Sequence, residues 1–196
     1  TINRLKQELF QKKNMKINIK NFVGITYLLI LSFILRLIAI YYYGDDTLEH
    51  EWSTLLKNLH NHSTLSFRSF NGALIPSVYM PPLYVFFLYL IKILTPQSFV
   101  FPQMVLVFQL ILSLLSIYIF FKLNNFFFNK NLSLFNSFLL SIFPLNIYAT
   151  TQISSVTLQL FLSILFLYLF LILYKSQKYK KHIFFYFSLV SGLLIL

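Results

Sequence analysis

Residues 22–51 read FVGITYLLILSFILRLIAIYYYGDDTLEHE, an apolar run of membrane-spanning length followed directly by acidic residues. The run at 22–43 exceeds the roughly 20 apolar residues that an α-helix needs to cross a bilayer. Four of the five acidic residues of the chain lie in the stretch that follows it: Asp45, Asp46, Glu49 and Glu51. The fifth is Glu8. Because acidic residues are so scarce elsewhere in the chain, we expect this acidic loop to contain the functional site.

The composition indicates an all-α integral membrane protein. Hydrophobic residues make up 58% of the chain, against roughly 45–50% in soluble domains. Together with the first run, further apolar runs predict a polytopic helix bundle, at 79–94, 103–123, 132–150, 154–174 and 183–196. The net charge of +11 comes from Lys and Arg beside these runs, which is typical of membrane orientation and not of nucleic-acid binding. The absence of cysteine excludes disulfides and thiolate metal sites.

The basic residues predict the topology. Residues 1–21 carry six of them, which places a basic N-terminus in the cytoplasm. The later basic residues can also lie in the cytoplasm only if one earlier apolar run does not cross the membrane. These residues are Lys122, Lys130 and the lysines at 175–181. The run at 79–94 is the shortest, opens with Pro81-Pro82, and as a helix reaches only about 24 Å. We therefore expect it to lie in the outer interface or to enter partway, within an extracytoplasmic loop at 44–102. A short tilted crossing is the alternative.

The acidic loop leads into an amphipathic helix. Apolar residues recur with helical spacing at Leu48, Trp52, Leu55, Leu56 and Leu59. Such a helix is expected to lie flat on the bilayer with Trp52 at headgroup depth. A structural interpretation of the acids stays open: Asp46 as N-cap with Glu49 at the third helical position forms a capping box. Asp45 and Glu51 are then simply solvated.

Cations and histidines near the loop are candidate ligands for an anion. Arg36 lies inside the first run, where a charge is costly and usually functional. It either snorkels to the outer headgroups, pairs with an acidic residue, or reaches an anionic group. Lys57 and Arg68 either contact a phosphate or are solvated. His60 and His62 lack the i, i+4 spacing of helical metal ligands, so no metal site is predicted. His50, beside Glu49, suits a phosphate or hydroxyl partner.

The order of these motifs resembles the N-terminal module of the C-type (GT-C) membrane glycosyltransferases. The resemblance is to the bacterial relatives of protein O-mannosyltransferase and of the lipid A aminoarabinose transferase. It rests on Arg36-Leu37, the acidic loop, the amphipathic helix, the sequence MPPLY at 80–84 and SIFPLNIY at 141–148. It covers residues 22–196, and we expect the chain to be the N-terminal part of a longer protein, with Met15 as a natural start. Leu48 stands where the family has the Asp of an Asp-Glu pair, and Val156-Thr157 where it often has an acid.

The resemblance implies transfer of a sugar from a polyprenyl-phosphate donor to an acceptor hydroxyl of a lipid, glycan or protein. The reaction is expected on the outer face of a bacterial inner membrane, with no certain cofactor. Glu49 is the expected general base or acceptor-positioning carboxylate, followed by Asp46 and Asp45. The expected contacts to the donor phosphate and sugar are Arg36, His50, Arg68 and Tyr79, while Tyr84 and Pro81-Pro82 shape the lipid entrance. The alternatives are a flippase or transporter of lipid-linked sugars, or a non-catalytic membrane scaffold.

Overall fold

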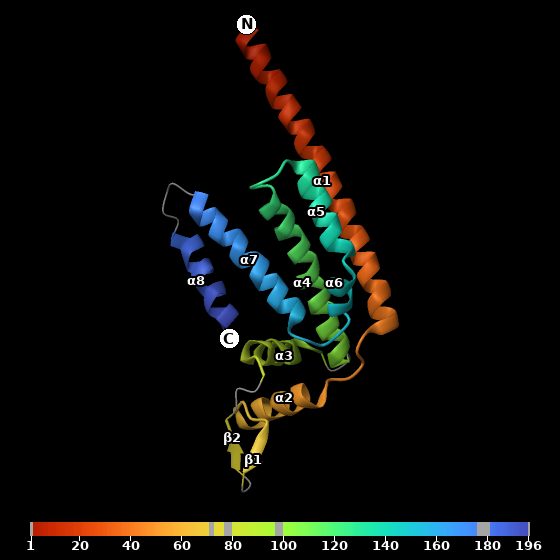
Figure 1. The fold of residues 1–196 in the computed structure, drawn as a ribbon, viewed down its shortest axis with the longest axis vertical. Coiled ribbons are helices and arrows are strands. Elements are labelled where there is room, and N and C mark those ends of the chain that lie inside the picture. Colours follow the sequence, from red (N-terminus) through yellow and green to blue (C-terminus); the bar gives the residue numbers. More distant parts are fainter. Residues whose placement is uncertain (1, 71–72, 77–79, 97–99, 176–180, 196) are drawn as a thin grey trace.

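The computed structural model describes residues 2–70, 73–76, 80–96, 100–175 and 181–195, and it is predominantly helical (Figure 1). Its helices are α1 (Ile2–Tyr43), α2 (His50–His62), α3 (Pro82–Leu94), α4 (Phe101–Asn124), α5 (Lys130–Ile142), α6 (Pro144–Ala149), α7 (Val156–Lys175) and α8 (Lys181–Ile195). Between α2 and α3, strands β1 (Arg68–Phe70) and β2 (Ala73–Ile75) pair antiparallel. This small hairpin is an exception to the all-α prediction.

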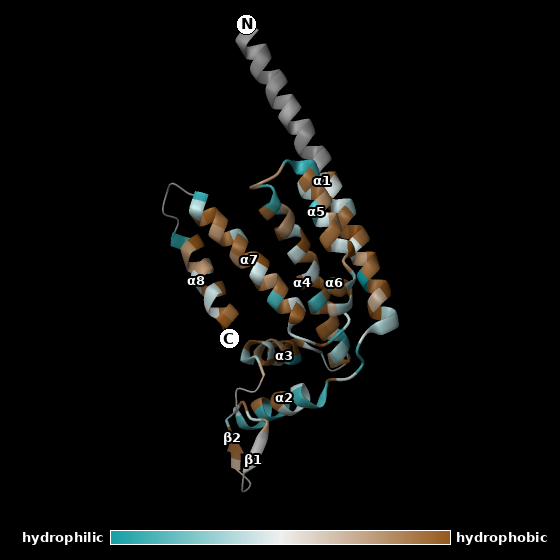
Figure 2. Cartoon of the chain, viewed as in Figure 1, coloured by the Kyte–Doolittle hydropathy of each residue, from teal (hydrophilic) through white to brown (hydrophobic). Residues whose placement is uncertain are grey.

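Among the described residues, three helices are long and apolar enough to cross a membrane. They are the segment Val23–Tyr43 of α1, α4 and α7, which confirms the predicted runs at 22–43, 103–123 and 154–174 as membrane-length helices. They lie in one bundle with α5 and α8, in which α4 contacts α1, α5 and α7, and α7 contacts α8. Figure 2 shows hydrophobic residues along the bundle helices and hydrophilic ones gathered toward their ends. The chain is therefore a helical membrane protein.

The run at 132–150 does not form the single helix that the sequence predicted. Helix α5 ends at Ile142, Phe143 is extended at ψ 118°, and α6 begins at Pro144. Proline has no N–H to donate and disfavours helical geometry in the residue before it, so the helix breaks at this point. The 13 residues of α5 reach only about 20 Å. Helix α6 follows α5 toward the end of the bundle at which α3 lies (Figure 1) and contacts α1 and α7.

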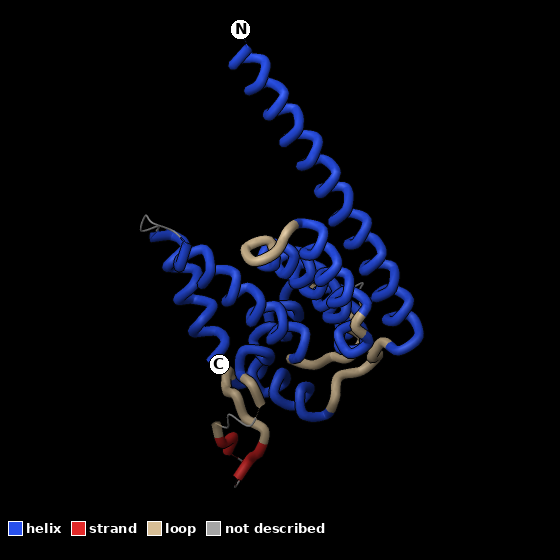
Figure 3. The backbone as a smooth tube through the Cα atoms, turned by 45° about the horizontal axis from the view of Figure 1, so that its top comes forward, coloured by secondary structure: helices blue, strands red, loops and turns tan. Residues whose placement is uncertain are grey.

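Helix α3 lies across the end of the bundle and not beside its helices (Figures 1 and 3). It begins after Pro81, has Pro82 in its first position, and ends after 13 residues. Proline suits that position because the first N–H of a helix has no partner within it. At about 20 Å it is too short to cross. This geometry agrees with the expectation that the run at 79–94 is not a crossing.

Helix α2 packs on α3 and not on lipid, which corrects the prediction for Trp52. Trp52 is only 5% exposed, and its ring meets the Tyr84 ring edge-on with 4.9 Å between centroids. Leu55 and Leu56 are buried in the same core, which also holds Leu88 of α3. The helical stripe was predicted correctly, but its partner was not. An apolar helix face is buried as well against a second apolar helix as against a membrane.

Four lysines and the acidic loop lie at opposite ends of the bundle. Four lysines mark one end, hereafter the lysine end, through their places at the ends of α4, α5, α7 and α8: Lys122, Lys130, Lys175 and Lys181. The N-terminal part of α1 projects beyond the same end (Figure 1). The Lys175 Nζ donates to the Phe126 carbonyl oxygen at 3.0 Å, which holds α7 against the loop between α4 and α5. The acidic loop, α2 and α3 lie at the other end.

Candidate functional site

The acidic loop leaves α1 through a close contact at Gly44. The Gly44 N–H donates to the Ile40 carbonyl oxygen at 2.8 Å, which closes the last turn of α1. A Cβ at this position would collide with that same carbonyl oxygen and would lie 3.1 Å from Leu106 Cδ1 of α4. Only glycine fits between the two helices, so the direction in which the loop leaves α1 depends on it.

Asp45 anchors the loop to the polar turn that precedes α7. Its Oδ2 accepts from the Ile153 N–H at 2.7 Å, and its own N–H donates to the Thr151 carbonyl oxygen at 3.0 Å. Beside them, Gln152 Nε2 donates to the Tyr43 carbonyl oxygen at 3.2 Å. These bonds join segments more than 100 residues apart. Asp45 therefore has a structural task that one of its carboxylate oxygens already fulfils.

Asp46 and Glu49 do not form the capping box that the sequence allowed. Helix α2 begins at His50, four residues after Asp46, and Glu49 is its N-cap at φ −54° and ψ 148° without a side-chain capping bond. The anchoring of Asp45 to the 151–153 turn holds the start of the loop, and the helix forms only beyond it. Asp46 and Glu49 are exposed, and no described residue hydrogen-bonds to either carboxylate. Glu51 lies in the first turn of α2.

Tyr84 connects the acidic loop with the bundle. Its side chain is 1% exposed and packs between Trp52 and Phe87, and its hydroxyl accepts from Gln109 Nε2 at 3.2 Å. Gln109, on α4, also donates to the Ser154 carbonyl oxygen at 2.8 Å. Burial raises the pKa of the Tyr84 hydroxyl well above its ordinary value, and the charges of Asp45 and Glu49 raise it further. Tyr84 is thus a neutral hydroxyl whose ring packs on the first turn of α2, directly after Glu49.

Arg36 lies inside the bundle and is not brought to the acidic loop. Its side chain is 1% exposed. Nε donates to Ser113 Oγ of α4 at 2.7 Å, while Nη1 donates to Ser32 Oγ at 2.5 Å and to the Ser141 carbonyl oxygen at 3.0 Å. Ser141 lies in the last turn of α5, where carbonyls lack helical partners. Arg36 therefore donates a hydrogen bond to a carbonyl oxygen at the end of the broken helix. It neither snorkels outward nor pairs with an acidic residue among the described residues.

The remaining predicted ligands are placed only in part. His50 opens α2, is exposed, and meets the Phe67 ring edge-on at 6.5 Å between centroids. Arg68 is the first residue of β1, and its side chain lies outside the described part of the structure. Tyr79 also lies outside the described residues. Within the described ranges, no group of three His, Asp or Glu side chains is arranged to hold a metal ion.

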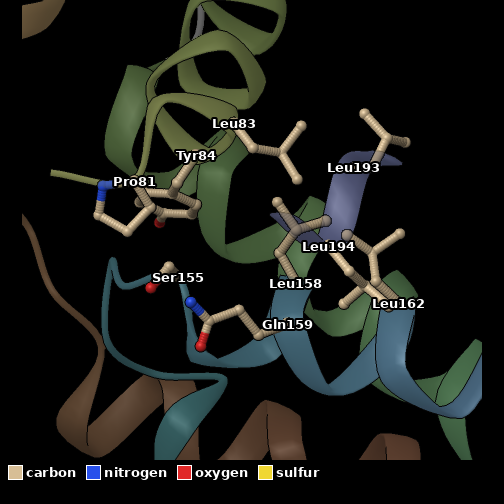
Figure 4. A pocket seen from close by; sticks show the side chains of 9 residues that line it. All are labelled: Pro81, Leu83, Tyr84, Ser155, Leu158, Gln159, Leu162, Leu193 and Leu194. Atoms are coloured by element: carbon tan, nitrogen blue, oxygen red, sulfur yellow. The ribbon is translucent and has the colours of Figure 1, made fainter. Parts of the chain in front are cut away.

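A small pocket adjoins Tyr84 at the boundary between α3, α7 and α8, with a cavity volume of about 40 Å³ (Figure 4). Its lining combines three polar side chains with apolar ones: Tyr84, Ser155 and Gln159 with Pro81, Leu83, Leu158, Leu162, Leu193 and Leu194. The sequence analysis missed Gln109, Ser155 and Gln159. Gln109 and Gln159 did carry a signal, because an amide inside an apolar run usually seeks a partner within the bundle.

Comparison with known proteins finds no relative of this chain: no family model, no curated protein and no solved structure matches it.

Proposed function

We propose that the protein is an integral membrane glycosyltransferase that moves a sugar from a polyprenyl-phosphate donor to an acceptor hydroxyl. One observation carries the proposal: two carboxylates of the acidic loop have different environments. Asp45 is hydrogen-bonded to the 151–153 turn, while Glu49 has no described hydrogen-bond partner. A general base needs a free carboxylate within reach of the acceptor proton. An anchored neighbour that fixes the loop gives such a base a defined position.

The charge distribution supports an outward-facing site. Lysines favour the cytoplasmic side of a membrane, so the lysine end is assigned to the cytoplasm and the acidic loop to the opposite face of a bacterial inner membrane. With α4, α5–α6 and α7 as successive crossings after α1, the lysine-bearing ends of α4, α5, α7 and α8 fall on one side, while Lys92 in the last turn of α3 lies at the opposite end. The donor lipid then approaches laterally through the bilayer, and its sugar reaches the acidic loop at the surface.

The proposed reaction is a single displacement at the anomeric carbon. Glu49 takes the proton of the acceptor hydroxyl, whose oxygen forms the new bond to the sugar. The bond between that carbon and the phosphate oxygen breaks, and polyprenyl phosphate leaves with the electron pair. Cations near the leaving phosphate stabilise its developing charge. His50, Arg68 and Tyr79 keep this assignment as donor contacts. Arg36 is assigned instead to support of the bundle, because its described bonds all go to serines of α1, α4 and α5.

A transporter of lipid-linked sugars is the second candidate, because α5 breaks at Pro144 within the bundle. Broken helices mark substrate sites in many transporters, through the backbone groups that they free. Here the freed Ser141 carbonyl oxygen already accepts from Arg36. The carbonyl oxygen that the helix break leaves without a helical partner is thus bonded within the protein and is not left for a substrate, which favours the transferase.

The test uses the full-length protein in proteoliposomes that contain polyprenyl phosphates carrying radiolabelled sugars and a mixture of hydroxyl-bearing acceptors. A transferase moves the label into a new product. A transporter changes the leaflet of the labelled lipid and leaves it intact, and a scaffold does neither. Transfer that survives Glu49→Asp but not Glu49→Gln supports a carboxylate base. A labelled lipid that only changes leaflet contradicts the proposal.

A further inference from the structure

We propose that the pocket between α3, α7 and α8 binds the hydrocarbon chain of the acceptor, which is then a hydroxyl-bearing lipid that enters from the bilayer. This inference rests on the proposed function and names its acceptor class. The pocket lies where the bundle meets α3, and four of its five leucines come from α7 and α8. The exposed side chains of the two helices are otherwise suited to lipid, as Leu167 and Leu189 illustrate.

The pocket is amphipathic in a defined direction. Tyr84, Ser155 and Gln159 gather on one side of it, and Leu158, Leu162, Leu193 and Leu194 on the other (Figure 4). The Tyr84 hydroxyl already accepts from Gln109, so its proton remains available for a ligand oxygen. A ligand with a hydroxyl group fits this pocket when its oxygen lies at the polar side and its carbon atoms contact the leucines. The cavity volume of about 40 Å³ holds roughly three water-sized groups, enough for the first carbons of a chain.

The charges favour the acceptor over the donor. None of the described residues that line the pocket is charged. Two acidic residues lie on the segments beside it: Asp45 bonds to Ile153, two residues before Ser155, and Glu49 is the N-cap of α2, whose Trp52 packs on Tyr84. A phosphate would lose its hydration here without gaining a cation, which is costly. A neutral hydroxyl loses little, because Tyr84 and Ser155 replace its hydrogen bonds with water.

Tyr84 also gives the bound hydroxyl its place in the reaction. It lines the pocket, and its ring packs on Trp52 in the first turn of α2, the helix whose N-cap is Glu49. An acceptor oxygen held at Tyr84 is therefore near the proposed base. The hydroxyl proton passes to Glu49, the oxygen binds the anomeric carbon of the donor sugar, and polyprenyl phosphate departs with the electrons of the broken bond.

Photolabelling tests the pocket without any need for catalysis. The full-length protein in vesicles is irradiated with a long-chain primary alcohol that carries a diazirine on its chain, and labelled peptides are identified. Leu162→Phe fills the pocket from α7. Leu167→Phe makes the same change at a position on α7 that is 51% exposed. We expect Leu162→Phe to reduce labelling of α7 and α8 about tenfold, the loss for excluding two buried methylene groups. We expect Leu167→Phe to leave labelling unchanged.

Competition identifies the occupant. Unlabelled long-chain alcohol is expected to suppress the labelling, while polyprenyl phosphate at equal concentration does not. Suppression by polyprenyl phosphate to the same extent assigns the pocket to the donor chain and overturns the proposal. Labelling of Leu162→Phe at the wild-type level also overturns it, because the chain then lies elsewhere.

Kinetics separates this proposal from the proposed function. In an active preparation, Leu162→Phe is expected to raise the KM for the long-chain alcohol about tenfold and to leave the KM for the donor unchanged. Activity toward a short, water-soluble alcohol is expected to persist, which shows that the variant is folded. A raised donor KM with an unchanged acceptor KM contradicts the acceptor assignment. If the wild type transfers no sugar to any acceptor, the proposed function fails, while the labelling result still decides whether the pocket binds an alcohol.

Discussion

The Asp45 anchor offers a direct test of how the site is held together. Asp45→Ala removes the acceptor of the 2.7 Å bond from the Ile153 N–H, and Ile153 is 2% exposed. Water cannot readily replace the lost partner. Asp45→Asn keeps an oxygen in the same place without the charge. Asp46→Ala is the matched control, since it deletes a neighbouring carboxylate that is exposed and has no described hydrogen bond.

The expected size follows from the cost of an unpaired buried donor, which is about 1–3 kcal/mol. A loss of about 2 kcal/mol lowers the Tm of a chain of this length by roughly 4–8 °C. Asp45→Asn loses only the charge-assisted part of the bond, so its Tm is expected to fall by less than half as much. Asp46→Ala stays within about 0.5 kcal/mol of wild type, as is usual for surface changes.

Thermal unfolding of the purified variants in one detergent measures these differences. The order expected for the Tm is wild type and Asp46→Ala together, then Asp45→Asn, then Asp45→Ala. Equal Tm values for Asp45→Ala and Asp46→Ala would refute the anchor, and Asp45 would then be free to act as the general base.

Three further predictions follow from the same contacts. Tyr84→Phe is expected to reduce the loss of stability at alkaline pH. Burial raises the pKa of Tyr84 in the folded protein above its unfolded value of about 10, so in the wild type the unfolded chain ionises first, and stability present below about pH 10 is lost above it. An equal fall in Tm between about pH 9 and pH 11 in both proteins would argue against this burial. Gly44→Ala is expected to cost about 1–3 kcal/mol through its collision with the Ile40 carbonyl, and a Tm equal to that of wild type would show that the loop leaves α1 differently. The chain has no cysteine, so single variants report sidedness: an impermeant maleimide on intact cells is expected to label Thr47→Cys in the acidic loop and to leave Asn131→Cys at the lysine end unlabelled until the membrane is opened, and the reverse pattern would invert the topology.

The membrane helices could be predicted because hydropathy alone determines them. The runs at 22–43, 103–123 and 154–174 needed only length and apolar composition. The broken helix needed more, although its signal was visible: Pro144 interrupts the run at 132–150, and proline inside a helical pattern ends the helix nearby. The hairpin also had a signal that was overlooked, since Asn71-Gly72 separates the two short strands and favours hairpins.

The environment of the candidate site depended on long-range contacts that no local pattern encodes. Asp45 bonds to Ile153, and Tyr84 to Gln109. The spacing of Asp46 and Glu49 suggested a capping box because capping rules consider only residues close in sequence. They do not include the hydrogen bonds of Asp45 to the 151–153 turn. Trp52 was expected at the membrane surface because its stripe identified a buried face but not the surface that buries it. The buried serines around Arg36 were likewise visible only once three helices were brought together.

The initial rate of sugar transfer by Glu49→Gln tests the central claim most directly. The measurement compares wild type, Glu49→Gln and the matched control Glu51→Gln, which removes the charge of a carboxylate two residues further on in the first turn of α2. All three are reconstituted at equal levels with the same donor and acceptor. The proposed base predicts a loss of about 10²–10⁴-fold for Glu49→Gln and little change for Glu51→Gln. Transfer by Glu49→Gln within about twofold of wild type would contradict the account, because no general base can be replaced by an amide at so small a cost.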